Sequence, residues 1–257
     1  MHDKQLQFQL PLQSQLLLLL LMPILLSGLT CSVFATTAVE FKNFSIKKQI
    51  DVLRAELETA KSNSFEILLQ AWSEKYGTLA FFPLIAIAKE KNVPDQKRYI
   101  ALMGATKLAT LLNGKDNIKN FVPFLKDSSW MIRSGALNAL KAANESKLGE
   151  AVLPMIYDPA LVIRVQVIDV LSKLHPTGTL KALIGSLEFS ENYNKQGKPL
   201  WVPGKVLLAL IDLKPLLILA GTLSSTISDL EKLRKKKNTH PEMREKIQKT
   251  INQLTIN

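Results

Sequence analysis

Apolar residues recur at helical spacing along most of the chain after residue 44. Steps of three and four residues are typical of amphipathic helices, and strand-like alternation is scarce. Turn residues such as Asn113-Gly114 and Thr177-Gly178 limit the helices to about 12 to 15 residues. Helices this short need stacked neighbours to bury an apolar face, which predicts a repeat. The clearest apolar stripes are Ile46, Ile50, Leu53 and Leu57; Ile118, Phe121, Val122 and Leu125; and Leu148, Val152, Met155 and Ile156.

One short motif recurs along the chain, an Asn or Asp followed six positions later by an Arg. Small or apolar residues follow each Arg, and Pro123 and Pro154 each lie four positions before the Asp of their copy. An Asp in a turn can cap the next helix, and a nearby Arg can hold the turn by charge-assisted hydrogen bonds. We therefore expect the motif to form a structural ladder of turns. Its members are Asn92 and Arg98, Asp127 and Arg133, Asp158 and Arg164, and Asn238 and Arg244.

This pattern resembles the HEAT repeat family, whose two-helix units carry a proline in the first helix, an Asp in the turn and an Arg in the second helix. The resemblance covers residues 78–256 in about five units. Units 114–143 and 145–175 match well, whereas 177–214 matches poorly, with Lys205 as the nearest counterpart of the Arg. The family implies an all-α fold, a right-handed α-solenoid of HEAT-like hairpins. It implies little about function, because such solenoids serve many ends.

The domain boundaries follow from this pattern. We expect a short linker at 36–44, a helical N-terminal capping pair at 45–76 and the HEAT-like solenoid at 77–257. Residues 1–35 are expected to be a signal peptide that precedes the fold.

The N-terminal segment is uncharged from Gln5 to Val39 and contains a leucine-rich run from Leu16 to Leu26. Eleven apolar residues suit the core of a secretory signal better than a membrane span, which needs about 20. Val33-Phe34-Ala35 fits the cleavage rule for signal peptidase, so we expect cleavage after Ala35 and a secreted or periplasmic protein. Two alternatives stay open: a lipoprotein modified at Cys31, and an uncleaved inner-membrane signal anchor.

Composition excludes several classes of protein. An apolar content of 47% in 257 residues argues against wholesale disorder, and one cysteine rules out an intramolecular disulfide. Three histidines and one cysteine disfavour a zinc site with nitrogen and sulfur ligands. The sequence has no HExxH or GxSxG motif and no phosphate-binding glycine loop. We therefore assign no catalytic, cofactor-binding or metal-binding residue, and we expect a protein that is not an enzyme and has no small-molecule substrate.

Candidate partner-binding residues follow from their distance to the repeated Arg. The exposed flank of the second helices lines the concave side of a solenoid. Its side chains have mixed chemistry, which suggests protein recognition. They are Tyr99, Met103, Asn138, Lys141 and Asp169.

A second candidate surface is the turn edge. Trp130 and Met131 align with Leu161 and Val162, so two adjacent turns would each present two apolar side chains. The alternative is that these side chains pack between neighbouring repeats.

A third candidate is the insertion from Phe189 to Trp201. Tyr193, Lys195, Lys198 and Trp201 could form a polar and aromatic binding loop, although a merely decorative insertion is equally consistent with the sequence.

Three functions remain. The leading hypothesis is a non-catalytic protein–protein interaction scaffold, exported to the bacterial cell envelope, that binds an unknown protein through its concave face or apolar turn edge. The net charge of +11, with Lys235 to Lys237 near the C-terminus, supports an alternative. In it, a basic module binds an anionic membrane, a cell-wall polymer or nucleic acid, the last being disfavoured for an exported protein. The third hypothesis is an enzyme of the HEAT-like lyase or glycosylase type.

Overall fold

A computed structural model describes residues 36–60, 65–112 and 115–256. Every regular element in these ranges is a helix, and the one isolated β-bridge within them joins Tyr193 to Pro199. The all-α class predicted from the apolar spacing is confirmed. The expected signal peptide, with its cleavage site and Cys31, lies outside the described residues.

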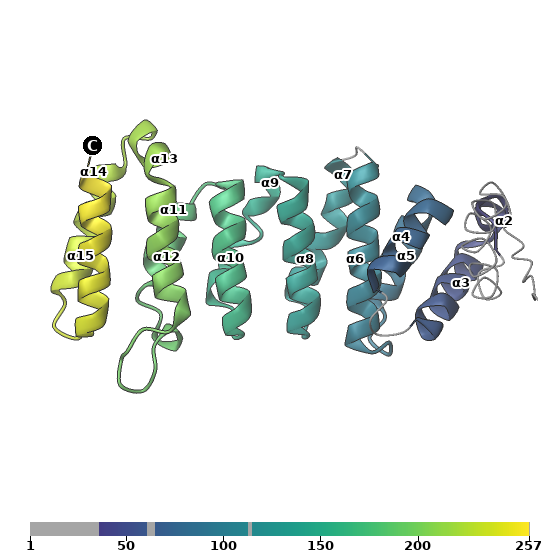
Figure 1. Ribbon diagram of the computed structural model, residues 1–257, viewed down its shortest axis with the longest axis horizontal. Coiled ribbons are helices and arrows are strands. Elements are labelled where there is room, and N and C mark those ends of the chain that lie inside the picture. Colours follow the sequence, from purple (N-terminus) through teal and green to yellow (C-terminus); the bar gives the residue numbers. More distant parts are fainter. Residues whose placement is uncertain (1–35, 61–64, 113–114, 257) are drawn as a thin grey trace, which may run out of the picture.

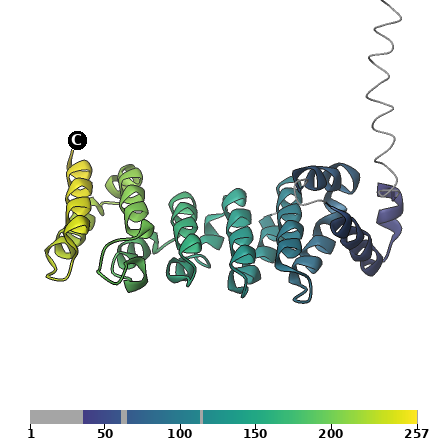
Figure 2. The same ribbon diagram turned by 60° about the horizontal axis from the view of Figure 1, so that its bottom comes forward.

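Five long helices lie side by side in one row (Figure 1), and the same order is kept in the rotated view of Figure 2. Each packs against the next, so the row is continuous from one end of the molecule to the other. All five run in the same direction, with their N-terminal ends at the lower edge of Figure 1. They are α6 (Asp95–Leu111), α8 (Trp130–Ala143), α10 (Leu161–Leu174), α12 (Trp201–Asp212) and α15 (Pro241–Thr255).

Five further elements connect the helices of this row and cover their other side. Each packs mainly against the helix of the row that follows it in the chain, except α11, which packs mainly against η3. They are α5 (Phe81–Lys89), η2 (Lys119–Lys126), η3 (Leu153–Tyr157), α11 (Thr179–Ser186) and α14 (Leu223–Lys235). Brief additional turns are α7 (Lys115–Ile118), α9 (Ser146–Gly149), η4 (Ser190–Asn192) and α13 (Lys214–Leu219).

Four of these connecting elements, α5, η2, η3 and α11, are shorter than the expected 12 to 15 residues, and in η2 and η3 a proline accounts for it. Pro123 lies inside η2 and Pro154 lies near the start of η3, and both elements are 3₁₀-helices. Proline lacks an amide hydrogen and clashes with the preceding turn, so it prevents a continuous α-helix here. Three residues of the predicted apolar stripe are nevertheless buried in the core: Ile118, Phe121 and Leu125.

The N-terminal part forms a small helical layer at one end of the row. Its elements are α2 (Ala38–Asn43), α3 (Ile46–Thr59), α4 (Phe65–Lys75) and η1 (Gly77–Ala80). The elements α3 and α4 lie where a capping pair was expected.

Residues 36–44, which were expected to be a short linker, contain the helix α2. Thr37 and Glu40 form a capping box, in which the Glu40 carboxylate accepts a 2.8 Å hydrogen bond from the Thr37 amide. Phe41 is fully buried and stacks on Tyr76, with ring centroids 4.1 Å apart. One helical turn with a single anchor shows no apolar period, so the pattern could not reveal it.

A buried polar cluster joins α3 to α4. The Glu56 carboxylate accepts hydrogen bonds from the Trp72 indole at 2.8 Å, the Lys75 ammonium at 3.0 Å and the Tyr76 hydroxyl at 2.6 Å. Burial and the adjacent Glu56 carboxylate raise the pKa of Tyr76 well above its usual range. Since every partner lies within the first 80 residues, the cluster stabilises the N-terminal layer rather than the row.

No helix among residues 36–60, 65–112 and 115–256 combines the length and apolar character needed to cross a bilayer.

Candidate interaction surface

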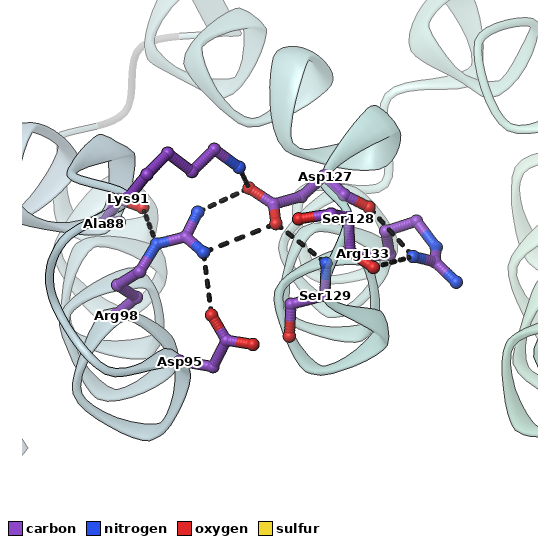
Figure 3. A network of polar contacts seen from close by, with 8 residues as sticks. All are labelled: Ala88, Lys91, Asp95, Arg98, Asp127, Ser128, Ser129 and Arg133. Atoms are coloured by element: carbon purple, nitrogen blue, oxygen red, sulfur yellow. Dashed lines mark hydrogen bonds and ion pairs between the residues drawn. The ribbon is translucent and has the colours of Figure 1, made fainter.

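The turns at the lower edge are joined by buried charged side chains, and the first connection runs from α6 to the turn before α8 (Figure 3). Arg98 donates to the Ala88 carbonyl and to Asp95, both at 2.9 Å, and also to the Asp127 carboxylate. Lys91 binds the same carboxylate, and the Ser129 amide donates to it at 3.0 Å.

These donors determine the protonation state of Asp127. Burial alone would raise the pKa of this carboxyl group, but hydrogen bonds from Arg98, Lys91 and the Ser129 amide outweigh it and lower the pKa to about 2. Asp127 is therefore an ionised carboxylate whose acceptor capacity is used within the fold.

The second connection repeats the geometry one unit further on. Arg133 binds Asp158 through two parallel hydrogen bonds of 2.7 and 2.8 Å, and donates to the Asp127 carbonyl at 2.8 Å. Asp158 in turn accepts from the Ala160 amide at 2.8 Å. Arg133 thus holds the turn of its own unit through a backbone carbonyl and the turn of the next unit through a side chain.

The third connection uses an asparagine that sequence reasoning missed. Arg164 donates at 2.8 Å to the side-chain oxygen of Asn192, whose amide nitrogen donates at 2.8 Å to the Ser186 carbonyl. An Asn suits this place because it must both accept and donate, which a carboxylate cannot do. The spacing carried a signal: 29 positions separate Arg98 from Asp127 and 28 separate Arg164 from Asn192.

The outer members of the predicted ladder lie apart from these connections. Asn92 and Asn238 are exposed, and Arg244 donates to the carbonyls of Lys236 and Lys237 at 3.1 Å. Lys205, the suggested counterpart of the Arg, instead forms an ion pair with Asp169.

Two of the five candidates on the flank of the long helices, Asn138 and Asp169, have partners within the fold. Gln166 donates to Asn138 at 2.8 Å and to the Ser134 carbonyl at 3.1 Å. Asp169 is paired with Lys205 at 2.8 Å. The other three candidates on this flank, Tyr99, Met103 and Lys141, are half-buried.

The lower edge carries apolar side chains that the fold leaves in solvent. Trp130 and Val162 are each 49% exposed, Leu200 is 37% exposed and Trp201 is 77% exposed. We call these four residues the apolar edge. The other two candidates here, Met131 and Leu161, are half-buried, and Leu161 packs against the core.

Trp201 belongs to this row rather than to a separate loop site. It begins α12, as Trp130 begins α8. The order of buried and exposed positions after Trp201 matches the order after Val162, so the two occupy equivalent places in the first turns of adjacent helices. Sequence reasoning had assigned Trp201 to the insertion because the repeated Arg is absent from α12.

Within the insertion, the aromatic side chain of Tyr193 is turned towards the fold. The Tyr193 hydroxyl donates to the Leu187 carbonyl, and burial together with the charge of Glu188 raises the pKa of Tyr193 to about 12. Lys198 ties the loop to Glu242 at 3.3 Å. A hollow of about 360 Å³ separates the loop from the turn before α15, with Tyr193 and His240 in its lining. Tyr193 and Trp201, predicted to act together, therefore face different surroundings.

A second hollow, of about 460 Å³, lies between η2 and η3. Its lining is mostly apolar and includes Val122, Leu125, Pro154, Tyr157 and Pro159. Lys126 is at its rim. Pro159 belongs to the turn that leads into α10, so this hollow adjoins the apolar edge.

No group of three or more His, Cys, Asp or Glu residues in the described part of the chain is arranged to hold a metal ion.

No protein-family model matches this chain, and no curated protein is significantly similar to it.

Proposed function

We propose that the protein is a HEAT-like right-handed α-solenoid that acts as a non-catalytic interaction scaffold, and that the apolar edge is its docking surface for a protein partner. The row of parallel helices and the repeated Arg connections support the solenoid. The observation that carries the function is the exposure of Trp130 and Trp201, which begin two helices whose N-terminal ends lie at the same edge of the row.

Exposed tryptophans of this kind favour a binding role. Trp is enriched among the residues that dominate the energy of protein interfaces, and a run of apolar groups in water is a feature of interaction sites. The long-helix flank is a weaker candidate, because Asn138 and Asp169 already have partners within the fold.

The basic-module alternative is weakened by local pairing. Lys232 pairs with Asp229 at 2.9 Å, Lys249 pairs with Glu245 at 2.8 Å, and Lys236 pairs with Glu188. Each pair places a carboxylate beside an ammonium group and so lowers the local positive potential that an anionic membrane or polymer would meet there. The lowered pKa of Asp127 does not support the enzyme alternative, since its carboxylate already binds Arg98 and Lys91 within the fold.

We propose the bacterial cell envelope as the place of action, from the apolar leader that ends at Ala35. Mass spectrometry of the protein recovered from cell fractions tests this. A mature chain that begins at Thr36 supports export with cleavage, a lipid adduct on Cys31 supports a lipoprotein, and an intact leader in the membrane fraction supports an anchor.

The docking surface is tested by co-purification at high salt with the variant Trp130→Ala/Trp201→Ala. Loss of a partner that the parent retains is the expected result, because both aromatic anchors are removed. Leu219→Ser is the matched control, since Leu219 is exposed at the other end of the long helices, after α12. Retention of the partner by the double variant, or its loss in Leu219→Ser, would contradict the proposal.

A further inference from the structure

We infer that the apolar edge takes an acidic, proline-rich segment of a partner, bound in the polyproline II conformation across the N-terminal ends of α8, α10 and α12. This inference rests on the proposed function and specifies the chemistry of the partner. It is carried by the spacing of the edge, by its aromatic and donor groups, and by its uncompensated charge.

The spacing of the edge matches one backbone conformation. Packed helices have axes about 8–10 Å apart, so the edge offers one apolar position about every 9 Å at Trp130, Val162 and Trp201. A polyproline II chain has three residues per turn and advances about 9 Å per turn, which places every third side chain over the next helix. A strand repeats each face about every 7 Å, which is shorter than this spacing.

The chemistry of the edge also suits such a chain. Proline rings pack on the flat faces of exposed aromatic residues, and the indole of Trp can donate to a backbone carbonyl. A polyproline II segment has no internal hydrogen bonds, and its prolines offer carbonyls without amide donors. The edge offers donors, because no side chain caps the N-termini of α8, α10 and α12.

The apolar hollow between η2 and η3 extends this surface. Pro159 links it to the start of α10, and Tyr157 is 45% exposed within its lining. Aromatic-lined depressions are the usual receptors for proline-rich segments. A chain crossing from α8 to α10 can therefore insert a proline ring beside Tyr157.

The charge along the edge selects an acidic partner. Lys126, Lys195 and Lys237 are exposed, and none of them forms an ion pair with another residue in the described ranges. The nearby acids are occupied, since Glu191 lies 3.7 Å from Arg164 and Glu242 binds Lys198. The parallel helix N-termini add positive potential in the same place. Complementary charge would raise both association rate and specificity.

The chain carries its own spectroscopic probes for this surface. Its three tryptophans are Trp72, Trp130 and Trp201. Trp72 is 1% exposed and its indole donates to Glu56, so it reports on the fold and not on the edge. The full chain, labelled with ¹⁵N at the indoles, is titrated with a blocked peptide of four Pro-Pro-Glu repeats. The indole signals of Trp130 and Trp201 should shift while that of Trp72 stays in place.

Matched peptides and variants separate conformation from charge. Pro-Pro-Lys repeats should bind at least tenfold more weakly than Pro-Pro-Glu repeats, because their charge has the wrong sign. Gly-Ser-Glu repeats should also bind at least tenfold more weakly, because they do not form a polyproline II helix before binding. Trp201→Ala should weaken the Pro-Pro-Glu peptide at least tenfold, whereas Leu219→Ser should leave its affinity unchanged.

Four outcomes would contradict the inference. Equal affinity for Gly-Ser-Glu and Pro-Pro-Glu repeats would show that binding depends on charge and not on the polyproline II conformation. Shifts produced by an amphipathic helical peptide and not by Pro-Pro-Glu repeats would assign a helical partner. Absence of any shift, with the partner still lost in Trp130→Ala/Trp201→Ala, would overturn the peptide chemistry and leave the docking surface standing. Absence of both effects would remove the proposed function as well.

Discussion

Arg133 shows at the scale of one residue how the turns are held. Its guanidinium group spans two units, with Asp158 on one side and the carbonyls of Asp127 and Ser128 on the other. Both Arg133 and Asp158 are buried, so neither charge can regain water if its partner is removed. The fold therefore depends on the pair even where the net gain from forming it is small.

Arg133→Ala should lower the free energy of unfolding by about 3–5 kcal/mol, because it leaves the Asp158 carboxylate buried without its bidentate partner. Urea denaturation followed by circular dichroism measures the change. Arg234→Ala is the control, since Arg234 pairs with Glu231 at the surface and should cost about 0.5 kcal/mol or less. Similar losses in the two variants would contradict the buried ladder.

The lowered pKa of Asp127 predicts that the stability of the fold depends on pH. Its pKa is lowered from 3.8 to about 2 in the folded chain, so its contribution is present above pH 3.8 and is lost as the pH falls towards 2. A shift of this size corresponds to about 2 kcal/mol. Asp127→Asn should be less stable at pH 7 and should show a flatter loss of stability between pH 5 and pH 2. An unchanged slope, compared with the surface variant Asp229→Asn, would contradict the assignment.

The residues of the ladder could be predicted only in part. Spacing and charge singled out Asp127, Arg133 and Asp158, which the structure joins through hydrogen bonds. Asn192 was not predicted as a member of the ladder, because the motif includes a following Arg and α12 has none. A repeat motif is recognised only where all its residues recur. Asn192 takes the place of the Asp without the Arg of the motif, so the repeat could not reveal it.

At the scale of the element, glycines set how closely the helices pack. A β-carbon added to Gly104 in α6 would lie 2.9 Å from the ring of Trp72, which is buried and held by Glu56. In contrast, a β-carbon on Gly204 in α12 would meet nothing within 4 Å. The same residue type thus has a packing role at one position and none at the other.

Gly204→Ala should stabilise the protein by up to about 1 kcal/mol, through the higher helix propensity of alanine. Gly104→Ala should instead destabilise it by about 1–2 kcal/mol, because overpacking against Trp72 exceeds that gain. Thermal denaturation of the two variants gives the comparison. A rise in melting temperature for Gly104→Ala would show that α4 can move away from α6, against the close packing described.

Elements with long apolar periods were the most predictable ones. The spacing located α3 and α4 and the buried stripe through Phe121. It could not show that Pro123 would confine η2 to a 3₁₀-helix, nor that Phe41 would anchor α2. These outcomes depend on single residues and on tertiary contacts, which leave no periodic trace.

At the scale of the whole molecule, the parallel direction of the long helices has a consequence for binding. It brings the first turns of α8, α10 and α12 to one edge, so residues far apart in the sequence form one row. Trp130 and Trp201 lie on one edge, on either side of α10, only because α8, α10 and α12 stack in order. The candidate surface could therefore be predicted at two adjacent turns, but not its extension to Trp201.

The most direct measurement is photo-crosslinking from single positions in living cells. A photoreactive phenylalanine analogue is placed at Trp201 on the apolar edge, at Asn138 on the long-helix flank, or at Leu219 at the other end of α12. The account predicts one discrete crosslinked protein from position 201 and none from 138 or 219. A crosslinked partner from position 138 or 219, with none from 201, would contradict the assignment of the apolar edge as the docking surface.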